Sequence, residues 1–318
     1  MRRRHKARRW KQPAGHFTHL DKIFWPKERF TKGDVIRYYN RVADVILPYL
    51  RNRPLVLNRH PNGIRGASFF QKNVDPKQLP PFVRTVSVRA RSTGRNVHYV
   101  VCNNKRTLLY LANLGCIEMH PWNSRLCTIR YPDFLSLDLD PGGNPFAETV
   151  AVARAVRKVV EQAGGHCLVK TSGKTGIHVI VPLRPQHDFA EVRAAAKSIA
   201  GIVNRRLPRL TTKRPNAGRP THRIYIDYVR NSTGQTLAAP YSLRAFPAAT
   251  VSTPIEWSEL TGSITPSRYT LRTIFRRLNA KGDIWQFAFR KSVSLVHLVR
   301  RLERMAEVAR REGRSRRA

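Results

Sequence analysis

Two aspartates separated by a single residue end a strongly alternating segment of the chain. Between Asp133 and Pro141 the sequence reads Asp-Phe-Leu-Ser-Leu-Asp-Leu-Asp-Pro, so that leucines alternate with Ser136, Asp138 and Asp140. On a strand the two carboxylates share one face, with their Cα atoms about 7 Å apart. Their oxygens are then close enough to share one or two divalent ions. The alternative is a solvated strand end paired with nearby arginines.

A third aspartate favours the metal hypothesis. Asp227 ends the β-like run that starts at Arg223. Oxygen ligands without accompanying Cys or clustered His favour Mg²⁺ or Mn²⁺ over zinc. Two such ions would lower the pKa of an attacking 3′ hydroxyl and neutralise charge on a triphosphate and its leaving pyrophosphate. We therefore predict that Asp138, Asp140 and Asp227 are the catalytic metal ligands.

The segment from Lys170 to His178 combines small residues with polar ones, in the order Lys-Thr-Ser-Gly-Lys-Thr-Gly-Ile-His. Glycines let backbone N–H groups approach phosphate oxygens, and Ser172, Lys174 and His178 could add donors. The segment is not a Walker A loop, because Leu168 stands where that motif needs its first glycine. The alternative is an ordinary hairpin turn. Two arginines further along the chain are additional candidates for phosphate contacts, namely Arg230 and Arg244.

Two further groups could meet a nucleotide or a nucleic acid. His120 follows an expected strand and could contact a sugar or a phosphate, although a lone His is often structural. Phe69 and Phe70 stand beside Lys72, so a base could stack on an aromatic ring while the lysine meets phosphate. The alternative for the two phenylalanines is an ordinary core pair.

The elements that must position these residues alternate irregularly between helix and strand. The hydrophobic periodicity predicts these helices: Thr31 to Leu50, Lys105 to Leu114, Phe146 to Ala163, Phe189 to Arg205 and, near the C-terminus, Lys291 to Arg311. It predicts these strands: Thr85 to Val88, Val97 to Cys102, Phe134 to Asp140, Cys167 to Thr171, Ile177 to Pro182 and Arg223 to Val229. Thr211 to Thr221 reads as a loop. The order lacks a regular βα rhythm, so we expect an α+β fold with mixed or antiparallel central sheets and flanking helices.

Composition points to a polyanionic partner. The 318 residues carry 59 Lys and Arg against 20 Asp and Glu, a net charge of +39 that attracts nucleic acid. No run of about 18 apolar residues occurs, so we expect no membrane partner and a cytoplasmic, nucleoid-associated protein. The cysteines, which show no C-x-x-C spacing and read as reduced and mostly buried thiols, are Cys102, Cys116, Cys127 and Cys167.

Read in order, these segments resemble the polymerase domain of bacterial ligase D, a member of the archaeo-eukaryotic primase superfamily. The motifs are Thr18-His-Leu-Asp21-Lys22, Phe69-Phe-Gln-Lys72, Leu108-Leu-Tyr-Leu-Ala-Asn-Leu-Gly115, Glu118-Met-His-Pro-Trp122, Leu137-Asp-Leu-Asp-Pro141, Thr171-Ser-Gly-Lys-Thr-Gly-Ile-His178, Ile226-Asp-Tyr-Val-Arg-Asn231 and Ala239-Pro-Tyr-Ser-Leu-Arg244. The resemblance covers roughly residues 17 to 286. It implies a primase-polymerase fold and the filling of gaps and extension of ends in non-homologous end joining, often with ribonucleotides and best with manganese.

The resemblance also assigns roles to individual residues. It marks Asp138, Asp140 and Asp227 as metal ligands. Contacts to the nucleotide and its triphosphate fall on His120, Ser172, Lys174, His178 and Arg244. Contacts to DNA fall on His19, Lys22 and Lys32 for a 5′ phosphate and on Phe69 and Phe70 for the template.

Two positions depart from the family pattern. Some members carry the lysine of the glycine segment one place later, where this chain has Thr175, so Lys174 would reach the phosphates by a different path. His19 stands where the family has an asparagine in the 5′-phosphate pocket, which makes recognition more sensitive to pH. No K-x-D-G adenylation motif occurs. We therefore expect a free-standing polymerase that works with a separate ligase and a Ku-like end-binding protein.

We divide the chain into a basic extension (1–16), a two-lobed catalytic domain (17–290) and a basic C-terminal helix and tail (291–318). Two other functions stay open. A primase that starts chains without a primer would use the same fold, and a non-catalytic scaffold that binds DNA ends would explain the charge. The scaffold gives no reason for three carboxylates at strand ends in a basic protein.

Overall fold

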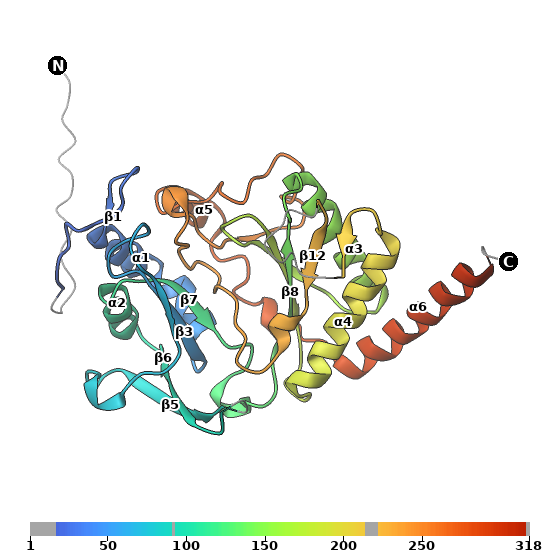
Figure 1. Cartoon of the computed structure of the whole chain (residues 1–318), viewed down its shortest axis with the longest axis horizontal. Coiled ribbons are helices and arrows are strands. Elements are labelled where there is room, and N and C mark those ends of the chain that lie inside the picture. The colour runs from blue at the N-terminus through green and yellow to red at the C-terminus, as the bar shows by residue number, and fades with distance from the viewer. Residues whose placement is uncertain (1–16, 91–92, 214–221, 316–318) are drawn as a thin grey trace, which may run out of the picture.

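The computed structural model describes residues 17–90, 93–213 and 222–315 (Figure 1). The helices are α1 (Lys32–Leu50), α2 (Lys105–Asn113), α3 (Phe146–Gln162), α4 (Phe189–Arg206), α5 (Ile274–Lys281) and α6 (Leu295–Ser315). The strands are β1 (Ile23–Trp25), β2 (Phe30–Thr31), β3 (Pro54–Arg59), β4 (Phe69–Gln71), β5 (Arg84–Arg89), β6 (Asn96–Val101), β7 (Cys116–Pro121), β8 (Phe134–Asp140), β9 (Leu168–Thr171), β10 (Ile177–Pro182), β11 (Thr211–Thr212), β12 (Ile224–Asp227) and β13 (Pro254–Ile255).

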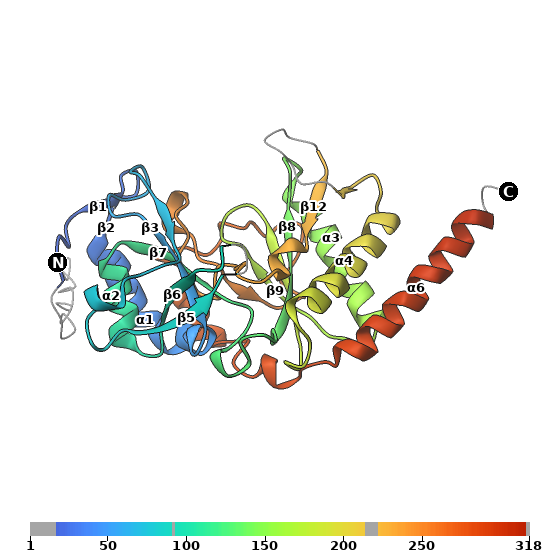
Figure 2. The ribbon, with the colours of Figure 1, turned by 60° about the horizontal axis from the view of Figure 1, so that its bottom comes forward.

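Two larger sheets organise the molecule and confirm the expected α+β class. One has five strands in the order β4-β3-β6-β5, with β7 also paired to β3, and the other has six in the order β11-β12-β8-β10-β9-β13. Their pairings are antiparallel except that of β11 with β12. The first sheet lies with α1 and α2, and the second with α3 and α4, in separate halves of the molecule (Figure 2).

Local chemistry sets where the helices begin. Thr31 caps α1 with its side chain accepting from the Asp34 N–H, and Asp188 caps α4 in the same way with Glu191 as its reciprocal partner. On β8 the alternating pattern places Leu135, Leu137 and Leu139 in the core, fully buried. Since α3 and α4 pack on β8, the polar face of this strand is left free to face the other half of the molecule.

Several boundaries differ from the sequence-based ones. The strand expected to run to Val229 ends at Asp227, because residues 229–231 turn into a short 3₁₀ helix. The segment expected to be a loop from Thr211 begins as strand β11, and its residues 214–221 lie outside the described part of the chain. The basic extension 1–16 also lies outside it. Three of the four cysteines are buried, as expected, whereas Cys127 is exposed.

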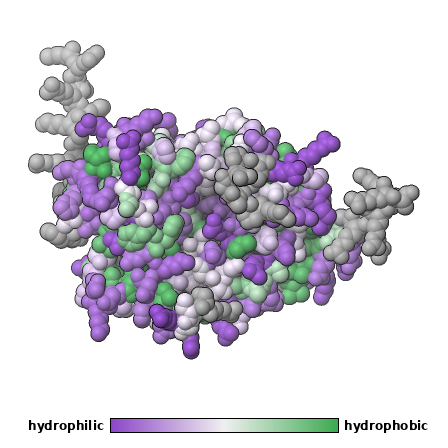
Figure 3. All heavy atoms as spheres, viewed as in Figure 1, coloured by the Kyte–Doolittle hydropathy of each residue, from purple (hydrophilic) through white to green (hydrophobic). Residues whose placement is uncertain are grey.

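The C-terminal helix α6 starts at Leu295, packs its first turns on α4 and then extends away from the body (Figure 1). On the face shown in Figure 3, hydrophilic side chains predominate and the apolar ones form small scattered groups. Among the helices that the structure describes, none combines the length and the apolar character needed to cross a bilayer.

Candidate active site

Four polar residues form a row straight across the six-stranded sheet. Strand register places Asp227 opposite Asp138, Asp138 opposite His178, and His178 opposite Lys170. Directly opposed residues in a sheet point to the same face, so the row runs over β12, β8, β10 and β9. Asp140, two residues beyond Asp138, lies on that face too. The structure thus brings the three predicted metal ligands onto one face of the sheet, on the neighbouring strands β8 and β12.

The row has a defined pattern of hydrogen bonds. The Lys170 Nζ lies 2.7 Å from His178 Nδ1, and the His178 Nε2 lies 3.3 Å from Asp138 Oδ1. An ionised carboxylate can only accept, so the ring hydrogen sits on Nε2, toward Asp138, and Nδ1 accepts from Lys170. Burial and the neighbouring Lys170 lower the pKa of His178 to about 4. Burial opposes ionisation of Asp138, yet His178 and Arg230 lower its pKa to about 2. A neutral imidazole therefore faces an ionised carboxylate at neutral pH.

The negative charges of the other two aspartates, Asp140 and Asp227, are less well balanced by neighbouring cations than that of Asp138. Burial and then the Asp138 charge raise the pKa of Asp140, and burial is also the main cause that raises the pKa of Asp227. Hard oxygen donors whose charges repel are suited to a divalent cation. The described residues contain no ready-formed group of three His, Cys, Asp or Glu side chains at metal-binding distances. Instead, the Arg230 Nε lies 3.1 Å from Asp227 and 3.7 Å from Asp138.

The glycine segment forms the turn between β9 and β10. The Ser172 hydroxyl accepts the N–H groups of Lys174 and Gly176 at 3.1 and 3.0 Å, which closes the turn and leaves its own O–H free to donate. Gly173 has φ +75°, and a Cβ there would lie 2.8 Å from the Arg244 side chain. At Gly176 a Cβ would lie 2.2 Å from the Leu139 carbonyl oxygen. Both glycines are therefore required for the turn to pack against its neighbours.

A cavity of about 420 Å³ opens between the two sheets at this turn. The predicted site residues that line it are Phe70, His120, Asp138, Lys174, His178 and Arg244. Ser172, Asp140 and Asp227 do not line it, although each lies next to or pairs with a residue that does. The lining comes from both sheets, so a ligand in the cavity would touch both halves of the molecule.

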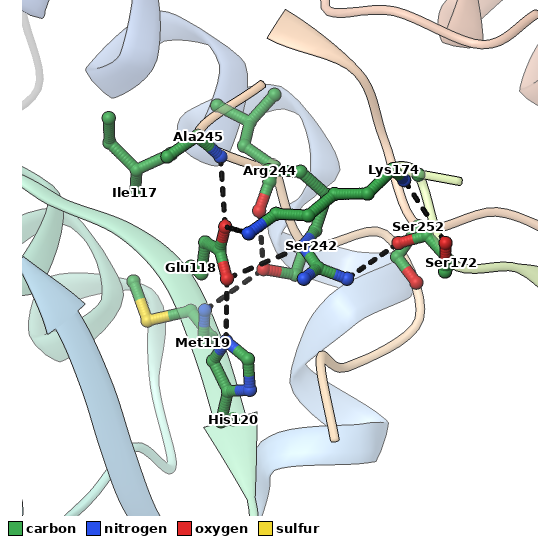
Figure 4. Close-up of polar contacts among 12 residues, drawn as sticks. Ile117, Glu118, Met119, His120, Ser172, Lys174, Ser242, Arg244, Ala245 and Ser252 are labelled. Atoms are coloured by element: carbon green, nitrogen blue, oxygen red, sulfur yellow. Dashed lines mark hydrogen bonds and ion pairs between the residues drawn. The ribbon is translucent and has the colours of Figure 1, made fainter. Parts of the chain in front are cut away.

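Glu118 is a polar residue of the site to which the sequence analysis gave no role. It is fully buried on β7, and its carboxylate contacts His120 at 2.8 Å, Lys174 at 3.1 Å and Arg244 at 3.4 Å (Figure 4). It also accepts the Ala245 N–H at 3.0 Å. Burial opposes its charge, but Arg244 and His120 hold its pKa well below the ordinary range. The available signal was its place two residues before His120, on the same face of a strand.

The residues expected at a 5′ phosphate lie together at the start of the chain. Exposed His19 adopts a left-handed conformation with φ +52°, and its carbonyl accepts the Lys22 N–H. Burial and then the nearby Lys22 lower the pKa of Lys32. The Lys32 ammonium donates to the carbonyl and hydroxyl oxygens of Thr18 at 2.7 and 3.1 Å, and Lys22 donates to Asn62. None of the three residues lines the cavity that Asp138 borders.

The two aromatic residues expected to meet a template are exposed. Phe69 is 46% and Phe70 60% accessible, so they are not the core pair that was the alternative. Phe70 also makes an edge-to-face contact with the ring of His120, with centroids 5.7 Å apart. An exposed aromatic beside the cavity is therefore available for stacking.

Known proteins match this chain over most of its length. A family profile described as LigD, primase-polymerase domain, matches residues 31–285. The bifunctional non-homologous end joining protein LigD of Bacillus subtilis is 35% identical over 274 residues, or 85% of this chain and 43% of that protein. The multifunctional LigD of Pseudomonas aeruginosa is 30% identical over 84% of this chain and 32% of its own length. The chain thus spans less than half the length of these curated relatives.

A solved structure shows the same architecture. The polymerase domain of Mycobacterium tuberculosis ligase D, in complex with DNA, superposes with a TM-score of 0.80 at 27% identity, covering 88% of this chain and 99% of that one. The profile, the relatives and the structure agree with each other and with the motifs that the two sheets bring together around the cavity. This chain belongs to the LigD primase-polymerase domain family.

Proposed function

We propose that this chain is a metal-dependent nucleotidyltransferase that fills gaps and extends DNA ends with nucleotides in non-homologous end joining. The observation that carries the proposal is the row of Asp227, Asp138 and His178 across one sheet, facing a cavity edged by cations. Membership of a primase-polymerase family supports the same reaction. DNA ends or gaps, nucleoside triphosphates, a ligase and a Ku-like end-binding protein are the proposed partners, and the cytoplasm is the proposed location.

Asp138, Asp140 and Asp227 would hold the metal, and Mn²⁺ or Mg²⁺ fits their oxygen donors. When bound, two such ions would activate a 3′ hydroxyl and stabilise the charge on the leaving pyrophosphate. The protein's own side chains orient the metal-binding carboxylates. His178 donates from Nε2 to Asp138 and holds that carboxylate in place, while Lys170 fixes the tautomer of His178. Arg230, which now lies against Asp138 and Asp227, would have to leave them.

The cations at the cavity are suited to a triphosphate. Arg244 is held rigidly, since one of its terminal nitrogens donates to the Ser172 carbonyl at 2.6 Å, and Lys174 borders the same space. His120 also borders it, but burial lowers the pKa of this imidazole, so it would contact the nucleotide as a neutral group. Charged donors fixed in advance stabilise developing negative charge without reorganising during the reaction. Phe69 and Phe70 would stack on template bases.

The test is extension of a labelled primer across a gapped duplex, with nucleoside triphosphates and Mn²⁺ or Mg²⁺. We expect template-directed extension by the wild type and loss of at least about a thousandfold in an Asp138→Ala, Asp140→Ala double variant. Asp44→Ala, which removes an exposed carboxylate on α1, is the matched control and should retain full activity. A folded wild type that binds DNA but never extends it would leave the scaffold function instead, and synthesis without any primer would favour a primase.

The 5′-phosphate site is tested by comparing gaps that carry a 5′ phosphate or a 5′ hydroxyl. Lys22→Met should weaken the preference for the phosphate while leaving extension of the hydroxyl substrate intact, because it removes one exposed cation from the group of His19, Lys22 and Lys32 that is assigned to this anion. Exposed Lys77 on the same half of the molecule offers the control substitution Lys77→Met. An undiminished preference in the Lys22 variant would contradict this assignment.

A further inference from the structure

Glu118 holds two cations that come from different parts of the molecule. Glu118 belongs to β7 of the five-stranded sheet, whereas Lys174 lies in the β9–β10 turn of the six-stranded sheet. Arg244 approaches from a long connection after β12. Figure 4 shows the Lys174 side chain reaching across Arg244 to the carboxylate. The Glu118 carboxylate thus joins both halves of the molecule at the cavity.

The two cations differ in their freedom to leave Glu118. The Arg244 side chain is 10% exposed, donates to Ser172 and packs against Gly173. The Lys174 side chain is 37% exposed and borders the cavity. A long, partly exposed lysine can rotate about its single bonds into another position at little cost, and a guanidinium held on two sides cannot. Lys174 is therefore the mobile member of the cluster.

The Glu118 carboxylate keeps enough partners to remain ionised when Lys174 moves away. With the lysine gone, Glu118 would still have Arg244, the His120 ring and the Ala245 N–H as partners. A buried charge is costly when it is left without partners, and the Glu118 carboxylate would still have three. A triphosphate carries several negative charges and competes strongly for an ammonium group at the mouth of the same cavity.

We propose that Glu118 is the resting partner of Lys174 and that an entering nucleoside triphosphate takes the lysine from it, while Arg244 stays in place. This inference rests on the proposed function. Glu118 acts as a positioning residue, because it contacts the cations and not the ligand. It keeps two neighbouring cations from repelling each other before the triphosphate arrives.

The test is a double-mutant cycle on binding of a fluorescent nucleoside triphosphate with Mg²⁺ and no primer. The chains are the wild type, Glu118→Gln, Lys174→Met and the double variant. Gln keeps the oxygen that accepts the Ala245 N–H. If the lysine must leave Glu118 in order to bind, Lys174→Met will weaken binding more in the Glu118→Gln background than in the wild type. A partly exposed ion pair sets this difference at up to about fivefold. The cycle cancels effects that Glu118→Gln exerts through His120 and Arg244.

Lys281→Met is the matched control, since the Lys281 side chain is 38% exposed and pairs with Glu256 at 2.6 Å on the end of α5. It should leave triphosphate affinity unchanged. An equal or smaller effect of Lys174→Met in the Glu118→Gln background would overturn the exchange. If urea unfolding shows that the Glu118→Gln variant is not folded, the Lys174→Met variant is tested by itself. Unchanged triphosphate affinity in Lys174→Met would then overturn the proposal, because the lysine would not reach the triphosphate. Absence of any triphosphate binding by the wild type would instead contradict the proposed function.

Discussion

Two glutamates of this molecule, Glu118 and Glu259, have the same kinds of partner but differ in the geometry of their contacts with arginine. Glu118 and Glu259 each contact an arginine and a lysine and accept one backbone N–H. Arg277 grips Glu259 with two hydrogen bonds of 2.5 and 2.7 Å. Arg244 approaches Glu118 at 3.4 Å, and its Nε has no hydrogen-bond partner among the described residues. Bidentate geometry is typical of a pair that supports structure, whereas an incompletely satisfied buried donor is typical of a site that awaits a ligand.

The largest expected effect is a difference in primer extension between variants of Arg244 and Arg277. Arg244→Gln should lower primer extension about a hundredfold or more, because it removes a fixed charged donor from the triphosphate site. Arg277→Gln should leave the extension rate per folded molecule unchanged. Single-turnover extension at saturating triphosphate measures both. Equal losses in the two variants would break the distinction between the clusters.

The next largest effect is on the free energy of unfolding, which we expect the Arg277 variant to lower. Arg277→Gln should lower the free energy of unfolding by about 2 kcal/mol, since it leaves Glu259 without its bidentate partner at a site that is mostly buried. The partial exposure of Glu259 keeps the cost below that of a fully buried pair. Urea unfolding followed by fluorescence gives the value. A loss under about 0.5 kcal/mol would show that the short contacts contribute little.

The pH dependence of stability gives the third effect. Burial opposes the charge of Glu259, but the Arg277 hydrogen bonds lower its pKa to about 2, from an ordinary value of 4.5. A depressed pKa in the folded state stabilises the protein above the ordinary value, and this contribution is lost as the pH falls toward about 2. Glu259→Gln should therefore cost about 1 kcal/mol at pH 7, after allowance for solvent screening, and almost nothing near pH 2. The comparison needs unfolding curves for both chains at several pH values; a gap that stays constant would contradict the assignment.

The smallest effect concerns the lysine of the structural cluster. Lys281→Met should leave the free energy of unfolding almost unchanged, since the lysine and both of its partners are partly exposed and an ion pair in water contributes little. Neither extension nor triphosphate binding should change. Thermal unfolding with and without triphosphate tests this. A shift of the triphosphate-induced stabilisation would mean that α5 communicates with the cavity.

Much of the site could be predicted because its signals are local. The alternation around Asp138 and Asp140 predicted a strand with one acidic face, and the register places Asp227 beside Asp138 on that face. The glycine segment predicted a hairpin turn, which the structure has between β9 and β10. The roles assigned to these residues, and to His19, Lys22 and Lys32, stay predictions until activity and binding are measured.

Other features could not be read from the chain. Lys170 reads as a surface-type residue, yet it is 2% exposed and donates to His178, because strand register places the two side by side. Arg230 lines the cavity, as a candidate for phosphate contact could, but its guanidinium also lies against two carboxylates. Each of these facts depends on which strand pairs with which.

The sequence by itself determined the types of the main helices and strands that it predicted, the acidic face of one strand, the glycine turn and a net charge that favours polyanions, but it did not predict strands β3 and β4 or helix α5. The features that it determined follow from periodicity, backbone freedom and net charge, which act over a few residues or over the whole chain without regard to the fold. Only the tertiary structure decided that Glu118, Lys174 and Arg244 meet. They come from separate sheets and connections, and their contact requires the two halves to pack at one relative position. No local pattern encodes such a meeting, because its free energy comes from burial and charge that exist only once the two sheets face each other.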